Sequence, residues 1–292
     1  DFVQPGRNGV NSAFACGSGV LWRVEAVRAI GGFATWNLVE DLTTSYYLHA
    51  AGYASAYHNE VLSIGLAPND IPGLLQQRGT WAVDNLRLFL FDNPLFKPGR
   101  LTLWQRLQYL ELGMFYLTTV FVLPLLMAIP LVSLATGSFV RIEGAALFPW
   151  MLSMGMYYLA LARGKIRYLL VYWKYWIGHW PTYTRAFWLA LRSRRRKPAY
   201  TVTRKTRREG FYGYMLWPQF TYIALALALI VRALIVVPGD NLTAMITNAG
   251  MALTFVYLMS GICSAAFYGL RLPAVLRPRW VLGRIIGNSP RS

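Results

Sequence analysis

The chain has 292 residues, of which 55% are apolar and only 14% are charged. Soluble globular domains carry about 25% charged residues, so this composition disfavours a soluble protein. The net charge of +17 would indicate a nucleic-acid partner in a soluble protein, whereas in a membrane protein it indicates topology.

Residues 1–70 predict a mixed α/β region. An apolar, strand-like run lies within residues 11–22, and the alternation over residues 54–64 predicts a second strand. Between them a helix is expected to begin at Glu40-Asp41 and to end at Gly52, because glycine commonly ends a helix.

Residues 71–108 predict amphipathic helices that are interrupted at Asn93-Pro94 and Pro98-Gly99. Their Trp, Phe, Leu and Arg content is typical of helices that lie in the membrane interface. Residues 165–191 carry a similar mixture of Trp, Tyr, Lys and Arg, which fits the lipid headgroup layer better than a protein core.

Four stretches are apolar enough to span a bilayer as helices: 112–136, 144–162, 217–237 and 241–270. The alternative is a set of buried helices in a large soluble core, which the lengths of these stretches disfavour. All Lys and Arg residues except Arg141 and Arg232 fall within 1–106, 163–208 and 271–292. Because cytoplasmic loops are enriched in Lys and Arg, both termini and the 163–216 connection are expected in the cytoplasm.

The sequence begins at Asp1 with no signal peptide before it, and we interpret it as a fragment of a longer protein. Cys16 lies in the expected cytosolic part and Cys263 in the last expected span. No disulfide is therefore predicted.

Four segments carry residues suited to chemistry, and each has a simpler structural explanation. Glu40-Asp41 could supply a general base or a metal ligand, or merely favour a helix start. Residues 15–19 could let a ligand approach the backbone, or form an ordinary tight turn. Residues 76–81 could bind sugar and phosphate, or anchor a helix at the interface. Residues 200–205 could hold a diphosphate, or belong to a basic cytosolic linker.

Together, the order of these segments resembles the C-terminal half of the processive membrane glycosyltransferases of family 2, of the bacterial cellulose synthase type. Residues 14–19 (FACGSG) are similar to the family's FFCGS/T motif, and residues 39–42 (VEDL) to its TED motif. Residues 77–81 (QRGTW) are similar to QxxRW, and residues 200–205 (YTVTRK) to the gating loop FxVTxK. The resemblance covers nearly the whole chain.

The resemblance implies an α-helical integral membrane protein with four transmembrane helices and interfacial helices, attached to the C-terminal part of a cytosolic α/β glycosyltransferase domain of GT-A-like fold. The implied segments are the end of the glycosyltransferase domain (1–70), interfacial helices with the QxxRW-like motif (71–106), transmembrane helices 1 and 2 (107–163), further interfacial helices (164–193), the gating loop (194–216), transmembrane helices 3 and 4 (217–270) and a cytosolic tail (271–292). The implied location is the bacterial inner membrane, with both ends in the cytoplasm.

The resemblance also assigns roles to individual residues. Asp41 would be the general base that deprotonates the acceptor hydroxyl, with Glu40 beside it. The implied acceptor site consists of Cys16, Gly17, Ser18, Gln77 and Trp81, whose indole would stack on the terminal sugar. The implied contacts to the nucleotide diphosphate are Arg78, Thr80, Tyr200, Val202, Thr203, Arg204 and Lys205.

The implied reaction is an inverting displacement at the anomeric carbon of an α-linked nucleotide sugar, which gives a β linkage and releases a diphosphate. UDP-glucose is the favoured donor, and a cellulose-like glucan, passed outward across the membrane, is the favoured product. A synthase of β-1,3-glucan, mannan or a hyaluronan-like polymer is the alternative within the enzyme class, and a non-catalytic membrane relative is the alternative outside it.

The expected partners are the UDP-sugar, the polysaccharide acceptor and the lipid bilayer, without nucleic acid; whether a periplasmic or accessory subunit also binds is left open. Mg²⁺ or Mn²⁺ is expected in the full-length enzyme. This chain contains no D-x-D sequence, so no metal ligand is assigned in it and the ligands are expected in a preceding half.

Three positions depart from the family pattern. Val39 stands in place of Thr and lacks its hydroxyl, and Ala15 stands in place of Phe. Thr80 stands in place of the Arg of QxxRW, a residue associated with the diphosphate. We hypothesise that a cation at Arg78, Arg204 or Lys205 contacts the diphosphate instead.

Overall fold

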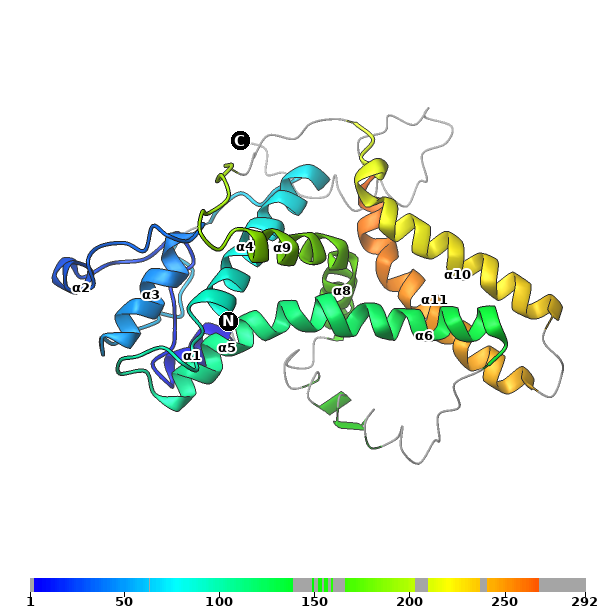
Figure 1. Cartoon of the computed structure of the whole chain (residues 1–292), viewed down its shortest axis with the longest axis horizontal. Helices are drawn as coiled ribbons and strands as arrows, with labels where there is room; N and C mark the ends of the chain where they lie inside the picture. The colour runs from blue at the N-terminus through cyan, green and yellow to red at the C-terminus, as the bar shows by residue number, and fades with distance from the viewer. Residues whose placement is uncertain are drawn as a thin grey trace.

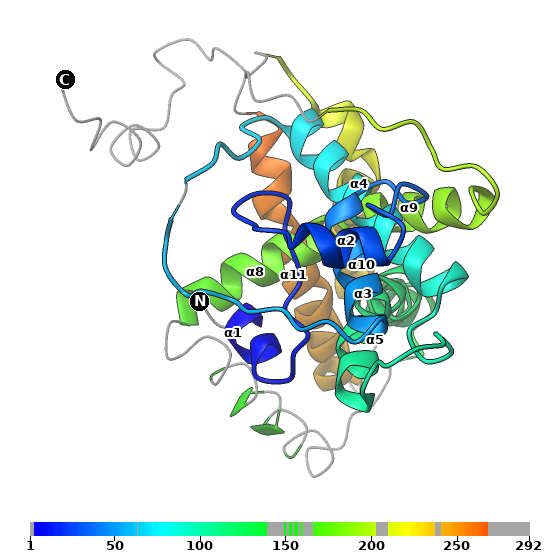
Figure 2. The same cartoon turned by 90° about the vertical axis from the view of Figure 1, so that its left-hand side faces the viewer.

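The computed structural model describes residues 3–62, 64–138, 166–202, 210–236 and 241–267, and the isolated positions 149, 152, 153, 155, 156 and 159. Three short helices, α1 (Val3–Asn8), α2 (Val24–Ala29) and α3 (Glu40–Ala50), lie at one end of an elongated molecule. The helices α6 (Leu123–Thr136), α10 (Trp217–Val236) and α11 (Leu242–Ala265) lie at the other end (Figure 1). Figure 2 looks at the end that carries α1, α2 and α3.

The helix α3 confirms the predicted helix between Glu40-Asp41 and Gly52. It begins at Glu40 and ends at Ala50, just before Gly52. Both acidic residues fall in its first turn, where the helix dipole favours negative charge. Its buried Leu42 and Tyr46 pack in one cluster with Leu88, so the start of α3 is held against a neighbouring helix.

The two predicted strands are wrong for the described residues, which contain helices as their only regular structure. Residues 12–22 and 53–59 are irregular. The hydrogen bonds between them involve side chains, whereas a β-ladder needs bonds between backbone groups. The Ser55 backbone N–H donates to Asn11 Oδ1 at 2.9 Å, and the Ser55 hydroxyl donates to the carbonyl of Ala13 at 2.7 Å. These bonds occupy groups that strand pairing would use.

The amphipathic region forms two helices, α4 (Ile71–Phe91) and α5 (Leu103–Leu117), separated by the predicted interruption. Asp70 begins α4 by accepting the backbone N–H of Gly73 at 2.8 Å. A capping box between Thr102 and Gln105 begins α5. The helix positions over residues 71–108 therefore follow the sequence pattern closely.

The first membrane-length helix runs without a break from Leu103 to Thr136, through α5, the π-helical turn η1 (Thr118–Val122) and α6. It includes the predicted span 112–136 and begins earlier, in the amphipathic region. Pro124 lies two residues after the π-helical turn, and its missing backbone N–H disrupts regular α-helical bonding.

Two further helices are long and apolar enough to cross a membrane: Gly213–Val236, formed by the short 3-10 turn η2 (Gly213–Leu216) and α10, and Leu242–Ala265, which is α11. They correspond to the predicted spans 217–237 and 241–270. The predicted span 144–162 lies outside the described residues apart from the isolated positions above. The described ranges thus contain three candidate spans.

The segment that follows consists of α8 (Ile166–Gly178) and α9 (Trp180–Arg192). The helix α8 packs against α11, and α9 packs against α4. Tyr183 and Phe187 are buried in a cluster with Ala82 and Leu86 of α4. Protein contacts therefore cover Tyr183 and Phe187, and the headgroup-layer location of this segment stays a prediction.

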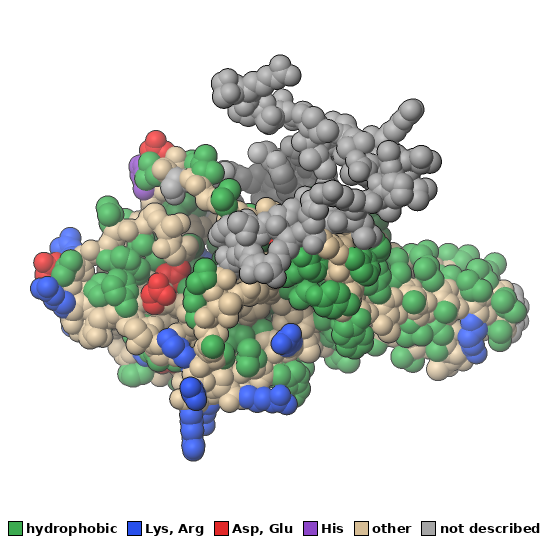
Figure 3. Space-filling view, turned by 90° about the horizontal axis from the view of Figure 1, so that it is seen from above, with side chains coloured by type: hydrophobic (Ala, Val, Ile, Leu, Met, Phe, Trp, Pro, Cys, Tyr) green, Lys and Arg blue, Asp and Glu red, His purple; other side chains and the backbone are tan. Residues whose placement is uncertain are grey.

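Hydrophobic side chains cover much of the end formed by α6, α10 and α11, whereas most of the visible charged side chains lie toward the other end (Figure 3). The most exposed apolar residues on these three helices include Leu125, Val132, Leu234, Ile235 and Ile246. An exposed apolar surface of this kind is suited to lipid.

Candidate functional site

Asp41 is a buried carboxylate at the start of α3, with 9% of its surface exposed, whereas the neighbouring Glu40 is exposed. The Asp41 Oδ1 atom accepts the backbone N–H of Leu42 at 2.7 Å. Burial raises the pKa of Asp41, this hydrogen bond lowers it, and the charge of Glu40 raises it further. Asp41 is therefore a stronger base than an exposed aspartate.

The turn around Cys16 and Gly17 lies against Asp41. A Cβ atom on Gly17 would lie 3.5 Å from Asp41 Oδ2, and Gly17 has a φ of +88°, which favours glycine. The Ser45 hydroxyl donates to the carbonyl of Asp41 at 2.8 Å and accepts the N–H of Ala15 at 3.0 Å. The structure thus brings this part of the acceptor motif to the carboxylate.

Cys16 and Ser18 differ from Gly17 in their surroundings. Cys16 Sγ accepts a hydrogen bond from the Gln4 amide at 3.2 Å. Burial raises the pKa of the Cys16 thiol, and the charge of Asp41 adds to this effect. Ser18 is exposed on the same turn.

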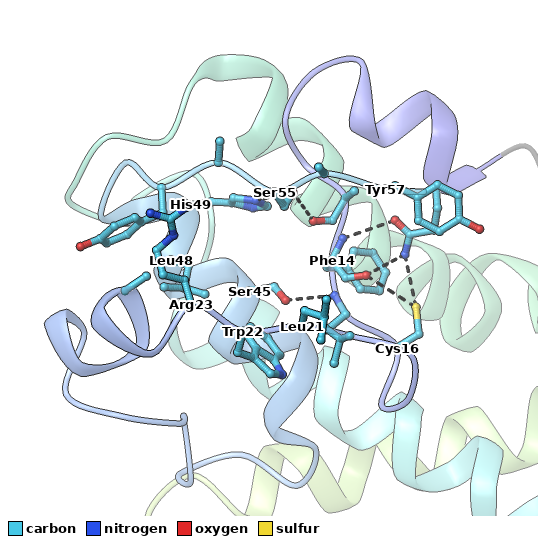
Figure 4. A pocket seen from close by; sticks show the side chains of 18 of the residues that line it. Phe14, Cys16, Leu21, Trp22, Arg23, Ser45, Leu48, His49, Ser55 and Tyr57 are labelled. Atoms are coloured by element: carbon cyan, nitrogen blue, oxygen red, sulfur yellow. Dashed lines mark hydrogen bonds between the residues drawn. The ribbon is translucent and has the colours of Figure 1, made fainter. Parts of the chain in front are cut away.

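A pocket of about 640 Å³ opens beside this turn, and Figure 4 shows the side chains that line it. Its lining includes Cys16, Ser18 and Ser45, but neither Asp41 nor Trp81. The pocket is therefore not the place where the general base would meet an acceptor stacked on Trp81.

His49 on α3 also lines this pocket but has a structural role. Its Nδ1 lies 2.8 Å from the Tyr109 hydroxyl, and its Nε2 lies 3.0 Å from the Ser55 hydroxyl. Burial lowers the pKa of His49 to about 4, so the ring is neutral near pH 7. His49 joins α3, α5 and the segment at Ser55.

The QxxRW-like residues lie in the middle of α4. The Arg78 guanidinium lies over the rings of Trp81 and Tyr175, with its Cζ atom 4.5 and 4.8 Å from the ring centroids. Burial lowers the pKa of Arg78. Trp81 is 39% exposed and Gln77 is half-buried, so part of the indole is open to a ligand.

Thr80 occupies the position of the family's Arg. Its hydroxyl donates to the carbonyl of Gln76 at 2.9 Å, within α4. Arg78 is directed into an aromatic environment, so its position favours support of Trp81 over replacement of the missing Arg.

The start of the gating-loop segment lies beside α4. The amide of Gln76 donates to the carbonyl of Thr201 at 2.7 Å, while Tyr200 and Val202 have exposed side chains. The remaining predicted loop residues, Thr203, Arg204 and Lys205, lie outside the described residues.

Two residues connect these segments: sequence reasoning missed Asp84, and it included Gln76 among residues 76–81 without predicting its contact with the loop. Gln76 precedes the QxxRW-like motif and binds the loop, as described above. Asp84 lies one helical turn after Trp81, and its Oδ1 accepts the backbone N–H of Val39 at 2.8 Å. An acidic residue among the apolar positions of an amphipathic helix was the signal that could have identified Asp84.

Glu40 and Asp41 are the two residues that the sequence suggested as possible metal ligands. In the described part of the chain, no three His, Cys, Asp or Glu side chains lie close enough to hold a metal ion. These residues therefore do not fit a complete divalent-cation site, and the expected Mg²⁺ or Mn²⁺ stays a prediction for the whole enzyme.

Comparisons with known proteins agree with the motifs. The cellulose synthase family model matches residues 24–188, more than half of the chain. The chain is 39% identical over 109 residues to Cellulose synthase 1 of Komagataeibacter xylinus. It is 37% identical over 109 residues to the UDP-forming Cellulose synthase 1 catalytic subunit of the same organism, and 34% identical over 107 residues to a UDP-forming cellulose synthase catalytic subunit of Dictyostelium discoideum.

Each of these alignments covers 37% of this chain, but only 7%, 14% and 10% of the respective relative. The chain therefore corresponds to a small part of the length of the curated relatives that it matches. The family model covers the segment from α2 to α9, which includes Asp41 and the whole of α4. With more than half of its length matched in this way, the chain belongs to the cellulose synthase family.

Proposed function

We propose that this chain forms the acceptor-side and membrane-spanning part of a processive, inverting β-glycosyltransferase. The observation that carries the proposal is the buried Asp41 carboxylate, with the Gly17 turn against it at the start of α3. The names of the relatives, which are UDP-forming cellulose synthases, favour a UDP-sugar as donor and a glucan as product. UDP-glucose is the donor to test first.

The proposed reaction is a single displacement. The acceptor hydroxyl oxygen forms a bond to the anomeric carbon of the nucleotide sugar, and its proton passes to the Asp41 carboxylate. The bond between that carbon and the diphosphate oxygen breaks, and its electron pair leaves with the diphosphate. One displacement inverts the configuration, so an α-linked donor gives a β-linked product.

Trp81 would bind the terminal sugar of the acceptor by stacking, and Arg78 would hold the indole through the cation–π contact. Cys16, Gly17, Ser18 and Gln77 would complete the acceptor site. Stacking fits a processive enzyme because it binds a sugar without fixing a single register.

The gating loop would close over the diphosphate through Thr203, Arg204 and Lys205, with Tyr200 and Val202 leading into it. The Gln76 bond to Thr201 supports this role because it holds the start of the loop beside α4. Of the three cations proposed to replace the missing Arg, Arg204 and Lys205 are preferred, since Arg78 lies against aromatic rings. None of the proposed steps runs through the expected divalent cation.

For the membrane part, we propose 144–162 as a fourth span, both termini in the cytoplasm and residence in the inner membrane, with the segment boundaries predicted above. Residues 1–70 would complete a GT-A-like domain. A polar path for the polymer is supported by three buried atoms that have no hydrogen-bond partner within the described part of the protein: Tyr175 OH, His179 Nε2 and Trp180 Nε1.

The test is polymer synthesis by the full-length enzyme in membrane vesicles supplied with radiolabelled UDP-glucose and Mg²⁺. We expect an insoluble product that a β-1,4-glucanase releases. Asp41→Asn should lower the rate by about 100-fold or more, because general base catalysis contributes on this scale. Glu25→Gln, an exposed acidic residue on α2, is the matched control and should retain activity.

Each other result contradicts a particular part of the proposal. An Asp41→Asn variant with full activity would exclude Asp41 as the base. A UDP-glucose product that a β-1,4-glucanase does not release would indicate a β-1,3-glucan synthase. A product from another UDP- or GDP-sugar alone would indicate a synthase of mannan or a hyaluronan-like polymer. No product from any donor would support the non-catalytic alternative.

A further inference from the structure

Asp84 is a carboxylic acid buried on α4, with 1% of its surface exposed. It lies three residues after Trp81, so the two side chains stand one helical turn apart. The proposed reaction gives Asp84 no role, although burying a carboxyl group is costly unless its hydrogen bonds compensate.

The contacts of Asp84 are with the segment that leads into α3. Its Oδ1 accepts the Val39 N–H at 2.8 Å, and its main-chain carbonyl accepts the side-chain amide of Asn37 at 3.0 Å. The same Asn37 amide reaches the hydroxyl of Thr43 on α3 at 3.1 Å. One residue of α4 therefore holds both ends of the segment Asn37–Val39.

This attachment matters because α3 lacks a capping side chain of its own. Val39 is its N-cap residue and makes no side-chain cap hydrogen bond. The next residues along the chain are Glu40 and Asp41. The position of the Asp41 carboxylate is thus set by an acceptor on another helix.

Arg87 strengthens the same attachment. Its Nε donates to Asn37 Oδ1 at 3.2 Å, and another of its nitrogens donates to the carbonyl of Trp36 at 3.0 Å. Within the described residues Asp84 makes no salt bridge, so its partners near α3 are backbone and amide groups. Such directional contacts fix geometry more than they neutralise charge.

We propose that Asp84 is a positioning residue that fixes the general base Asp41 relative to the acceptor-binding Trp81. The inference rests on the proposed function, in which both residues act on the same acceptor sugar. A base works only within hydrogen-bond reach of the proton that it removes. A displacement of about 1 Å can lower a rate by about 100-fold.

The experiment uses the full-length enzyme in membrane vesicles and measures kcat and the KM for the sugar nucleotide. Asp84→Ala removes the acceptor for the Val39 N–H. We expect kcat to fall by about 10- to 100-fold and KM to stay within about 2-fold, because geometry is lost and donor binding is not.

Asp84→Asn keeps an oxygen that can accept the same hydrogen bond and removes the charge. The Asp84→Asn variant should retain kcat within about 3-fold of the wild type. If the negative charge of Asp84 were required, kcat would fall in this variant as well. Asn85→Ala is the matched control, since the Asn85 side chain is partly exposed and bonds to a carbonyl of its own helix.

Amounts of each variant in the membrane are measured in parallel. If Asp84→Ala does not accumulate, Asp84→Ser replaces it, because a serine hydroxyl within a helix can donate to the carbonyl four residues earlier. Its shorter side chain does not reach Val39, so the same fall in kcat is expected.

Two results would overturn the inference: full kcat in Asp84→Ala or Asp84→Ser, or a loss in Asp84→Asn as large as in Asp84→Ala. Failure of the proposed function has a different signature, because wild-type vesicles would then make no polymer from any sugar nucleotide. That result would overturn both.

Discussion

Asp41 and Asp84 are two buried carboxyl groups with different surroundings. Asp41 faces the Gly17 turn and bonds to the N–H of Leu42 in its own helix. Asp84 bonds to Val39, and burial raises the pKa of Asp84 to about 7, with the charge of Asp41 as a smaller contribution in the same direction. At the residue scale, the proposed function has Asp41 meet the substrate and Asp84 hold Asp41 in position.

The Gly17 turn gives a prediction at this scale. In Gly17→Ala the new methyl group would lie about 3.5 Å from Asp41 Oδ2, a normal contact that covers the oxygen. We expect kcat for polymer synthesis to fall by about 10-fold or more, because the acceptor hydroxyl needs this space. The positive φ should also cost about 1 kcal/mol of stability.

Gly31→Ala is the control for that backbone cost. Gly31 has a φ of +86° and no atom within 4 Å of an added Cβ, so it has comparable strain and no carboxylate nearby. Thermal unfolding should shift similarly in both variants, while only Gly17→Ala loses turnover. Equal turnover in Gly17→Ala and Gly31→Ala would show that Gly17 serves the backbone turn and that the acceptor does not need the space beside Asp41.

At the element scale, α4 connects the parts of the candidate site. It packs on α9 and α5, carries Trp81, binds the segment before α3 through Asp84 and binds the start of the gating loop through Gln76. A single helix with these contacts can hold the acceptor residue, the base and the loop in a fixed relation.

The Gln76 contact predicts a selective effect on the donor. Gln76→Leu keeps the size of the side chain and removes the bond to Thr201, so the loop should hold the nucleotide less well. Since one hydrogen bond contributes about 0.5–1.5 kcal/mol, the KM for the sugar nucleotide should rise by about 2- to 10-fold with little change in kcat.

Gln108→Leu on α5 is the matched control for this substitution. Gln108 accepts a hydrogen bond from the Arg7 guanidinium through its backbone carbonyl, which the substitution keeps, so both constants should stay unchanged. A Gln76→Leu enzyme with wild-type KM would show that the loop binds the nucleotide without this attachment.

The sequence predicted those elements whose signals are local. The start of α3 at Glu40 follows from the two acidic residues of its first turn, and the interruption at Asn93-Pro94 follows from a helix breaker. The strands over residues 11–22 and 54–64 were wrong for the described residues, because a strand depends on distant partners. Here the Ser55 N–H bonds to the Asn11 side chain, and the Ala13 carbonyl accepts the Ser55 hydroxyl. Local alternation does not reveal such a bond.

The same distinction applies to the candidate site. Asp41 and Gly17 were predicted from motifs, and the structure brings them together. Asp84 and the loop contact of Gln76 were missed, because the partners of these two residues lie 45 and 125 residues away in the sequence. Side chains that act by joining distant segments carry no short-range pattern, except that a buried acid on an apolar helix face calls for a partner.

At the scale of the whole molecule, two ends with different surfaces meet along the long helix Leu103–Thr136. Its first part packs with α4 beside the candidate site, and its second part packs with α10 and α11. Arg7 of α1 forms a 2.9 Å salt bridge with Glu111 on this helix. The helix α1, which precedes the acceptor motif in the sequence, is thereby attached to a candidate membrane span.

The proposed topology gives the last prediction, which depends on whether 144–162 crosses the membrane. Ser138 and Thr201 are exposed positions on either side of this segment. With four spans, Ser138→Cys faces outward and Thr201→Cys faces the cytoplasm, whereas without the 144–162 span both face outward. In intact cells a membrane-impermeant maleimide should label Ser138→Cys alone.

Native Cys16, which is exposed, is the cytoplasmic control and should react only after permeabilisation. Labelling of Thr201→Cys in intact cells would contradict the fourth span and place the gating loop on the side opposite Asp41, where it could not close over the same substrate.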